Sequence, residues 1–191
     1  MADETKRLDS NVAGNFFVDA TCINCDTCRQ LAPASFEEVG TYSAVTTQPT
    51  DDGHIQQAYQ ALLACPVGSI GTEHSDKVRI KEAMASFPLQ IEGEVSYCGF
   101  NSEKSFGANS FLIEHPDGNW LVDSPRYLRH LIEAFEHRGG IAYIFLTHKD
   151  DVADAEKYAA RFGAKRLIHR ADIEAAPDAE WIIEATDSLQ V

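Results

Sequence analysis

The stretch Cys22-Ile23-Asn24-Cys25-Asp26-Thr27-Cys28 places three cysteines with two residues between neighbours, and a fourth cysteine, Cys65, directly precedes Pro66. A C-x2-C-x2-C loop of this kind wraps its backbone around a compact inorganic cluster, and a distant cysteine closes the other side. The spacing therefore predicts that the first third of the chain holds one iron–sulfur cluster.

The cysteine count indicates which cluster to expect. In two-cluster proteins with this motif, a further cysteine follows the third after three residues and binds the other cluster. Ala32 stands at that position here, and residues 56–64 contain no cysteine. We therefore expect one 4Fe-4S cluster, because the middle cysteine that three-iron sites usually lack is present. The expected ligands are Cys22, Cys25, Cys28 and Cys65. A zinc site and disulfides are the alternatives, and zinc is not expected because zinc sites prefer paired C-x2-C units.

Length and composition fit a globular protein of one large or two small domains, with 191 residues and ordinary hydrophobic content. No apolar run approaches the roughly 18 to 20 residues that cross a bilayer. The start, Met1-Ala2-Asp3-Glu4-Thr5, is acidic and lacks the apolar segment of a signal peptide. We expect a cytoplasmic protein, or one in the plastid stroma after processing, since a reducing compartment suits thiolates that bind iron.

The formal net charge of -14 argues against nucleic acid as a partner, because phosphates require a basic surface. Residues 1–75 carry ten Asp or Glu against three Lys or Arg, which is a dense acidic field for so small a segment. Such a field steers oppositely charged proteins. It predicts a redox partner protein with a basic face, with solubility alone as the alternative.

Local patterns give the order of elements around the cysteines. Ile55, Ala58, Tyr59, Leu62 and Leu63 recur at helical spacing, which predicts a helix that delivers Cys65 at its end. The other expected elements are a strand over 16–18, a helical turn over 34–39, strands over 41–47 and 67–72, and a helix-starting turn over 49–53. Residues 14–73 thereby resemble a single-cluster bacterial-type ferredoxin, in which a longer helix replaces the second cluster.

After a polar connector, the pattern changes to short strands and then to alternating helices and strands. We expect strands over 93–99, 109–115, 120–123, 141–146, 166–169 and 181–183, and helices over 126–137 and 152–162. The strand at 141–146 lacks polar alternation, as in a sheet that is buried on both faces. The sequence thus predicts a ferredoxin-like domain at 1–73, a connector at 74–86 and a second module at 87–191.

Three places in the second module resemble the N-terminal half of the metallo-β-lactamase fold. They are Asn109 to Asp123, Phe145-Leu146-Thr147-His148 and Leu167-Ile168-His169. The fold class that this implies is α+β, a ferredoxin-like cluster domain followed by an α/β half of a metallo-β-lactamase-like fold. Nearly the whole chain resembles a family of ferredoxin-fused proteins of photosynthetic organisms.

The resemblance also implies a metal-binding pattern, T-H-x-H-x-D-H, that this chain does not keep. His148 matches the first histidine, and Asp150 stands at the second. Val152 and Ala153 occupy the aspartate and the third histidine, and the later motifs of that fold would lie beyond Val191. Zinc-dependent hydrolysis is therefore not expected. Because half of that fold supplies one of its two packed sheets, we expect a homodimer or another partner on the uncovered face.

The function that these observations predict is one-electron transfer on a single cluster, with the second module as a docking or regulatory scaffold. One alternative is a redox-gated metallo-hydrolase or oxidoreductase with a site at His148 and Asp150, and another is an iron–sulfur redox sensor. The competing role for Asp150 or Asp151 is to cap the next helix. Cys98 is expected to be a buried free thiol rather than a ligand.

Overall fold

The computed structural model describes residues 2–184 and divides the chain into two compact units, Met1–Phe87 and Pro88–Val191. The end of the predicted second module, residues 185–191, lies outside the described part. Within residues 2–184, no helix is long and apolar enough to cross a membrane.

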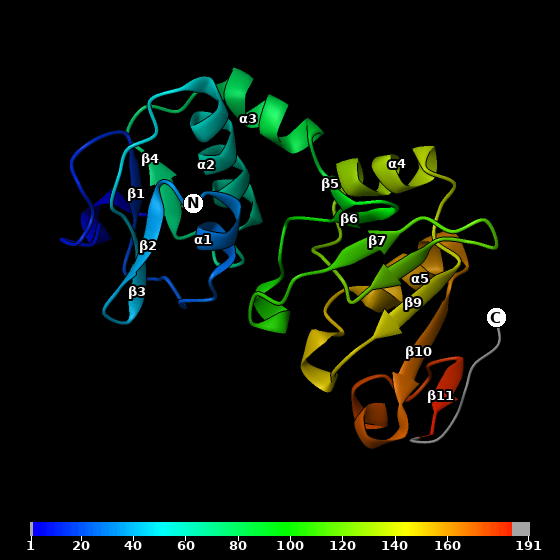
Figure 1. The fold of residues 1–191 in the computed structure, drawn as a ribbon. Coiled ribbons are helices and arrows are strands. Elements are labelled where there is room, and N and C mark those ends of the chain that lie inside the picture. Colours follow the sequence, from blue (N-terminus) through cyan, green and yellow to red (C-terminus); the bar gives the residue numbers. More distant parts are fainter. Residues whose placement is uncertain (1, 185–191) are drawn as a thin grey trace. The chain divides into compact units, whose positions relative to one another are not determined.

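The first unit comprises two small two-stranded sheets and three α-helices (Figure 1). Strand β1 pairs with β4 and β2 pairs with β3, and both pairs are antiparallel. The elements are η1 (Glu4–Lys6), β1 (Phe16–Val18), α1 (Thr27–Leu31), β2 (Phe36–Val39), β3 (Tyr42–Val45), α2 (Asp52–Ala64), β4 (Ile70–Thr72) and α3 (Lys77–Ala85).

Helix α2 forms as the sequence predicts and places the fourth cysteine. The side chain of Asp51 caps its start by accepting a hydrogen bond from the His54 amide at 3.0 Å. Ala58, Tyr59 and other residues of one face are buried in the core. Cys65 is the C-cap residue and Pro66 follows, so the end of the helix fixes the position of that thiol.

Strand β2 covers Phe36–Val39 after a turn over residues 33–35, so the prediction of a helical turn over 34–39 is wrong for residues 36–39. Phe36 is buried and pairs with Val45 across the β2–β3 hairpin. Gly40, with φ of +68°, closes the tight turn between the strands. Cross-strand burial of Phe36 therefore overrides the local helical tendency of Glu37 and Glu38.

Residues 74–86, expected as a polar connector, contain helix α3. The Asp76 carboxylate caps it by accepting from the Val78 and Arg79 amides. Ala83 is fully buried in the same core as Ala58 of α2. The helix therefore belongs to the first unit.

The second unit is built on one sheet, whose strand order in the described residues is β11-β10-β9-β8-β7-β6-β5. Strands β5 to β8 are antiparallel to their neighbours, and β8 to β11 are parallel. The strands are β5 (Leu89–Glu92), β6 (Val95–Tyr97), β7 (Phe111–Ile113), β8 (Trp120–Val122), β9 (Tyr143–Leu146), β10 (Lys165–His169) and β11 (Trp181–Ile183), and the helices are α4 (Arg129–His137) and α5 (Ala155–Phe162). Short 3-10 turns are η2 (Glu103–Ser105), η3 (Lys149–Asp151) and η4 (Arg170–Ala175).

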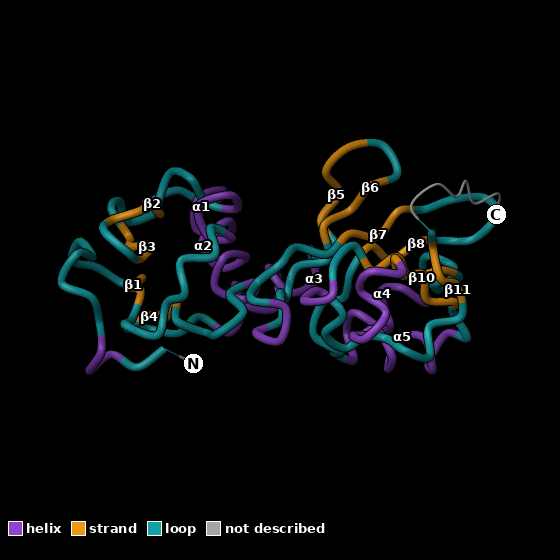
Figure 2. The backbone as a smooth tube through the Cα atoms, turned by 90° about the horizontal axis from the view of Figure 1, so that it is seen from below, coloured by secondary structure: helices purple, strands orange, loops and turns teal. Residues whose placement is uncertain are grey.

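The two faces of this sheet differ in burial. On one face, Leu112, Leu121 and Ile144 are fully buried. Helices α4 and α5 pack together there, since the rings of Phe135 and Tyr158 meet at 5.7 Å. The opposite face carries half-buried apolar side chains at the alternate positions, among them Phe111, Ile113, Trp120, Val122, Tyr143, Phe145 and Trp181. Figure 2 shows both helices on one side of the strands.

Candidate iron–sulfur site

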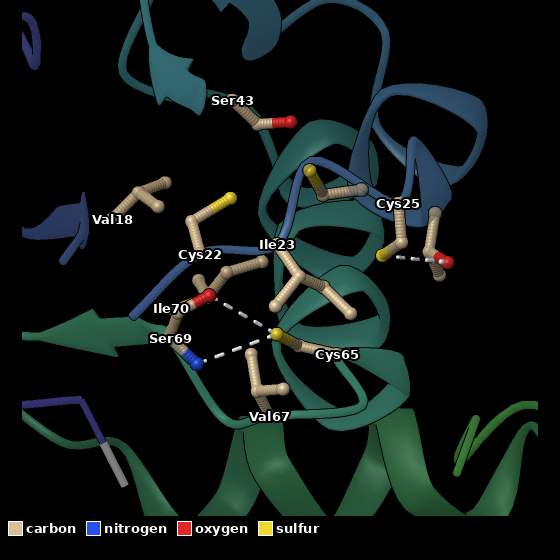
Figure 3. Close-up of a pocket in the computed structure, with 11 residues that line it drawn as sticks. Val18, Cys22, Ile23, Cys25, Ser43, Cys65, Val67, Ser69 and Ile70 are labelled. Carbon is tan, nitrogen blue, oxygen red and sulfur yellow. Dashed lines mark hydrogen bonds between the residues drawn. The ribbon is translucent and has the colours of Figure 1, made fainter. Parts of the chain in front are cut away.

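Four cysteines line one small cavity in the first unit. Cys22 and Cys25 come from the loop between β1 and α1, and Cys65 comes from the end of α2 (Figure 3). Cys28 lies in the first turn of α1. The rest of the wall is apolar or hydroxylic and comprises Val18, Ile23, Thr27, Ser43, Val67, Ser69 and Ile70. The structure thus brings together all four cysteines that the spacing singles out.

The cysteine loop turns sharply because two of its residues have left-handed backbone conformations. Asn24 has φ of 55° and Asp26 has φ of 71°, and asparagine and aspartate tolerate this region best among non-glycine residues. The Arg29 guanidinium holds both side chains, with 2.6 Å from Nε to Asp26 Oδ1 and 2.6 Å from Nη1 to Asn24 Oδ1. Sequence reasoning missed Arg29, although asparagine and aspartate between the cysteines signalled the turns that it stabilises.

The Cys28 thiol is costly to ionise inside this cavity. Burial raises the pKa of the Cys28 thiol to about 11, and the three other cavity sulfurs add to the rise. Four thiolates cannot share such a cavity unless positive charge compensates them. Bound metal ions deprotonate coordinating thiols outright. The donor set and its surroundings therefore fit a metal cluster.

The cavity cysteines do not form the compact group that a single metal ion requires. Among residues 2–184, no three His, Cys, Asp or Glu side chains are placed to hold a single metal ion. In an iron–sulfur cluster each cysteine binds a different iron, so the four sulfurs need not converge on one point.

Each cavity sulfur has a polar neighbour. The Asn24 amide donates to Cys22 Sγ at 3.4 Å, and the Ser69 amide donates to Cys65 Sγ at 3.3 Å. Thr27 Oγ1 is 3.5 Å from Cys25 Sγ, and Ser69 Oγ is 3.3 Å from Cys65 Sγ. The nearby Ser43 hydroxyl acts to lower the pKa of Cys28, against the larger rise that burial causes. Sequence reasoning did not identify these hydroxyls, although Thr27 and Ser69 lie only two and four residues from the cysteines that they contact.

The second predicted site, His148 and Asp150, has local contacts. His148 Nδ1 accepts a hydrogen bond from the Asp150 amide at 3.3 Å and lies 3.4 Å from the Asp150 carboxylate. His148 therefore caps the short turn η3, whereas the N-cap position of α5 is Asp154. The expectation that Asp150 or Asp151 caps that helix is wrong. Metal binding at His148 and Asp150 stays a prediction.

The fifth cysteine lies in the other unit. Cys98 is fully buried, and burial raises the pKa of its thiol to about 12. A thiol in this state is a poor nucleophile and a poor ligand. Cys98 is thus a buried free thiol, as the sequence predicts.

Comparison with solved structures gives metallo-β-lactamases as neighbours. The class B3 di-zinc metallo-β-lactamase LRA-12 from an Alaskan soil metagenome is 15% identical with a TM-score of 0.44, covering 55% of this chain and 48% of that one. FEZ-1 from Legionella gormanii is 16% identical with a TM-score of 0.43, covering 55% and 49%. A β-lactamase from Chitinophaga pinensis is 18% identical with a TM-score of 0.42, covering 62% and 52%. The chain spans about half the length of these structures.

The comparison of the sequence with family models bears on the cysteine cavity itself. A comparison with curated protein sequences gave no match. Residues 18–72 match the family model described as "4Fe-4S single cluster domain of Ferredoxin I". This range contains Cys22, Cys25, Cys28 and Cys65 and the whole cavity wall. The first unit therefore contains a ferredoxin-type iron–sulfur domain over residues 18–72.

Proposed function

We propose that the chain is a one-electron carrier that holds a single 4Fe-4S cluster through Cys22, Cys25, Cys28 and Cys65. The observation that supports this most is the cavity in which the four cysteines meet inside a ferredoxin-type domain. When bound, such a cluster supplies a one-electron couple without breaking any covalent bond of the protein. The second unit serves as a docking or regulatory scaffold.

The protein's own residues bind the cluster and control its exposure. The four thiolates would be its ligands, and the apolar wall formed by Val18, Val67 and Ile70 excludes water. Ile23 lines the same cavity, yet 45% of it is exposed. Since electron transfer requires close approach, we propose that a redox partner docks over Ile23.

The surface beside this loop is acidic. Glu37 and Glu38 are exposed on β2, and Glu38 accepts a hydrogen bond at 3.0 Å from Asn24 of the cysteine loop. Opposite charges raise the association rate of redox proteins. The proposed partner is therefore a redox protein with a basic face. The excess of acidic residues over 1–75 attracts the same basic face.

Anaerobic iron and sulfide analysis, with EPR spectra before and after dithionite reduction, tests this function. We expect about four iron and four sulfide per chain, no EPR signal as isolated and a rhombic signal after reduction. Zinc in place of iron would contradict the proposal. A cluster that does not reduce reversibly would indicate a structural or sensing role instead.

A further inference from the structure

We propose that the Ser69 hydroxyl donates a hydrogen bond to the sulfur of Cys65 and thereby raises the reduction potential of the cluster. This inference rests on the proposed function, and it makes Ser69 a positioning residue that acts through a ligand without being one. Two dashed lines in Figure 3 join Ser69 to that sulfur. One comes from its backbone nitrogen and the other from its side-chain oxygen, so one residue contacts one ligand twice.

The turn that follows α2 brings Ser69 back to Cys65. Gly68 has φ of +68°, a left-handed conformation that lets the chain reverse directly before Ser69. The Ser69 carbonyl accepts a hydrogen bond from the Asp19 amide at 2.8 Å, and the Asp19 carbonyl accepts one from the Cys22 amide at 3.2 Å. The backbone of Ser69 is therefore held by the segment that leads into the cysteine loop, which fixes the position of its side chain.

The direction of the side-chain hydrogen bond follows from the hydrogens that each group has. Ser69 Oγ lies 3.3 Å from Cys65 Sγ, and either group can donate while the cysteine is a thiol. A metal-bound cysteine is a thiolate without a hydrogen, so the hydroxyl must then be the donor. Ser69 is 2% exposed, and within residues 2–184 its hydroxyl has no other hydrogen-bond partner. A buried hydroxyl without an acceptor is costly, so its hydrogen points to the sulfur.

The surroundings of Cys65 strengthen this hydrogen bond. Cys65 is buried, and Val67 and Ile70 line the cavity beside it with apolar groups. A hydrogen bond to a charged acceptor is about twice as strong as one between neutral groups, and a low dielectric strengthens it further. The half-buried Cys22 differs, because its sulfur accepts from the Asn24 amide at 3.4 Å in a more exposed part of the loop. We therefore assign the larger effect to the Cys65 side.

The expected consequence is a higher reduction potential. An external reductant such as dithionite supplies one electron, and no covalent bond of the protein forms or breaks. The added negative charge is shared with the ligand sulfurs, and a donor to a sulfur stabilises it. The Ser69 amide acts in the same direction as the hydroxyl. Only the hydroxyl can be removed by a side-chain substitution, so its contribution can be measured by itself.

The test compares the midpoint potential of Ser69→Ala with that of the wild-type full chain in an EPR-monitored reductive titration. Alanine keeps the backbone amide, so the difference reports the hydroxyl. We expect full iron and sulfide content and an equilibrium constant for reduction that is lower by about tenfold, which is about 59 mV for one electron. The matched control is Ser35→Ala, the same change at a buried serine outside the cavity wall. It should keep the wild-type potential.

A second pair of variants separates the hydroxyl from the shape of the side chain. Ser69→Thr and Ser69→Val add side chains of nearly equal shape, of which only threonine carries a donor. We expect Ser69→Thr to have the higher potential of the two. Pulsed EPR of the reduced wild type after brief exposure to deuterated buffer should show a deuteron near the cluster, since hydroxyl hydrogens exchange faster than hydrogen-bonded amides. Ser69→Ala should lack this deuteron.

Either of two results would overturn the role of Ser69: an unchanged potential in a Ser69→Ala protein with full iron content, or equal potentials in Ser69→Thr and Ser69→Val. If Ser69→Ala does not retain iron, the threonine and valine variants decide by the same measurement. A wild-type chain without a reducible cluster is a different failure, since it contradicts the proposed function before any variant is compared.

Discussion

The sulfur of Cys65 lies 3.3 Å from the backbone nitrogen of Ser69, so the turn that follows α2 holds the last cysteine in place. The side-chain oxygen of Ser69 lies at the same distance from that sulfur. Cys65 is therefore fixed from both sides, by the helix that ends at it and by the segment that leads into β4. A thiol positioned in this way is ready to bind iron without rearrangement of the backbone.

Replacement of Cys65 by serine should remove the cluster or convert it to a labile form. Serine keeps the size of the side chain but removes the soft thiolate that iron–sulfur clusters require. The matched control is Cys98→Ser, which changes a buried cysteine of the other unit. Iron and sulfide per chain, measured anaerobically, should fall in Cys65→Ser and stay at the wild-type value in Cys98→Ser. Equal cluster content in Cys65→Ser and wild type would remove Cys65 from the ligand set.

Charge reversal at Glu37 should slow electron transfer to a basic redox protein. Glu37 is exposed on β2, beside the hairpin residue that contacts the cysteine loop. We expect Glu37→Lys to lower the second-order rate roughly two- to tenfold at low ionic strength, and added salt to reduce the difference. Stopped-flow reduction of a cationic protein acceptor measures this rate.

Glu82→Lys, which changes an exposed acid on α3, serves as the charge-matched control for that experiment. It should alter the rate less than Glu37→Lys. If both variants slow the reaction equally, the acidic field acts as a whole and the face beside the cysteine loop has no special role.

Asp154 should stabilise the second unit in a pH-dependent way. Burial opposes its ionisation, but hydrogen bonds from Lys104, Lys157 and the Tyr127 amide outweigh this and lower the pKa of Asp154 to about 2. A lowered pKa means that the stabilisation is complete above the unfolded value of 3.8 and is lost as pH falls toward about 2. Asp154→Asn should therefore lower the free energy of unfolding by about 2 kcal/mol at neutral pH.

Denaturant unfolding followed by tryptophan fluorescence measures the effect of Asp154→Asn, because both tryptophans, Trp120 and Trp181, lie in the second unit. The difference from wild type should shrink in acid. Glu174→Gln, at an exposed carboxylate of η4, should leave the unfolding midpoint within error. If Asp154→Asn lowers the free energy of unfolding by the same amount at all pH values, the loss comes from packing and not from the charge of Asp154.

The sequence predicts a helix correctly where the spacing of apolar residues and the capping residue at its start indicate the same element. Helix α2 follows from Asp51 and from apolar residues at helical spacing, and the position of Cys65 follows from α2. Strand β2 was missed because Glu37 and Glu38 carry no strand signal, and only the pairing of Phe36 with Val45 determines the conformation. The Arg29–Ser43 contact was missed for a related reason: it spans fourteen residues and depends on how the hairpin folds back over the cysteine loop.

The half-buried sheet face of the second unit should mediate a homodimer. Trp120 stacks on Tyr143 at 4.5 Å, and Tyr143 contacts Trp181 at 5.7 Å, so aromatic rings cross three strands on the face opposite to α4 and α5. A second copy offers the same apolar surface in return, as a two-fold interface requires. We expect light scattering to show a dimer, and Tyr143→Lys to shift it to monomer.

The control for the dimer is Phe106→Lys, which changes a side chain that is 71% exposed but lies in a loop outside the sheet. This variant should remain dimeric, since an isolated exposed aromatic residue does not form a contiguous apolar surface. A wild-type chain that scatters as a stable monomer and binds no hydrophobic dye would contradict the prediction. In that case the rings of Trp120, Tyr143 and Trp181 would stabilise the sheet through contacts with one another alone, and the double replacement Trp120→Ala and Trp181→Ala should then lower its unfolding temperature without any change in mass.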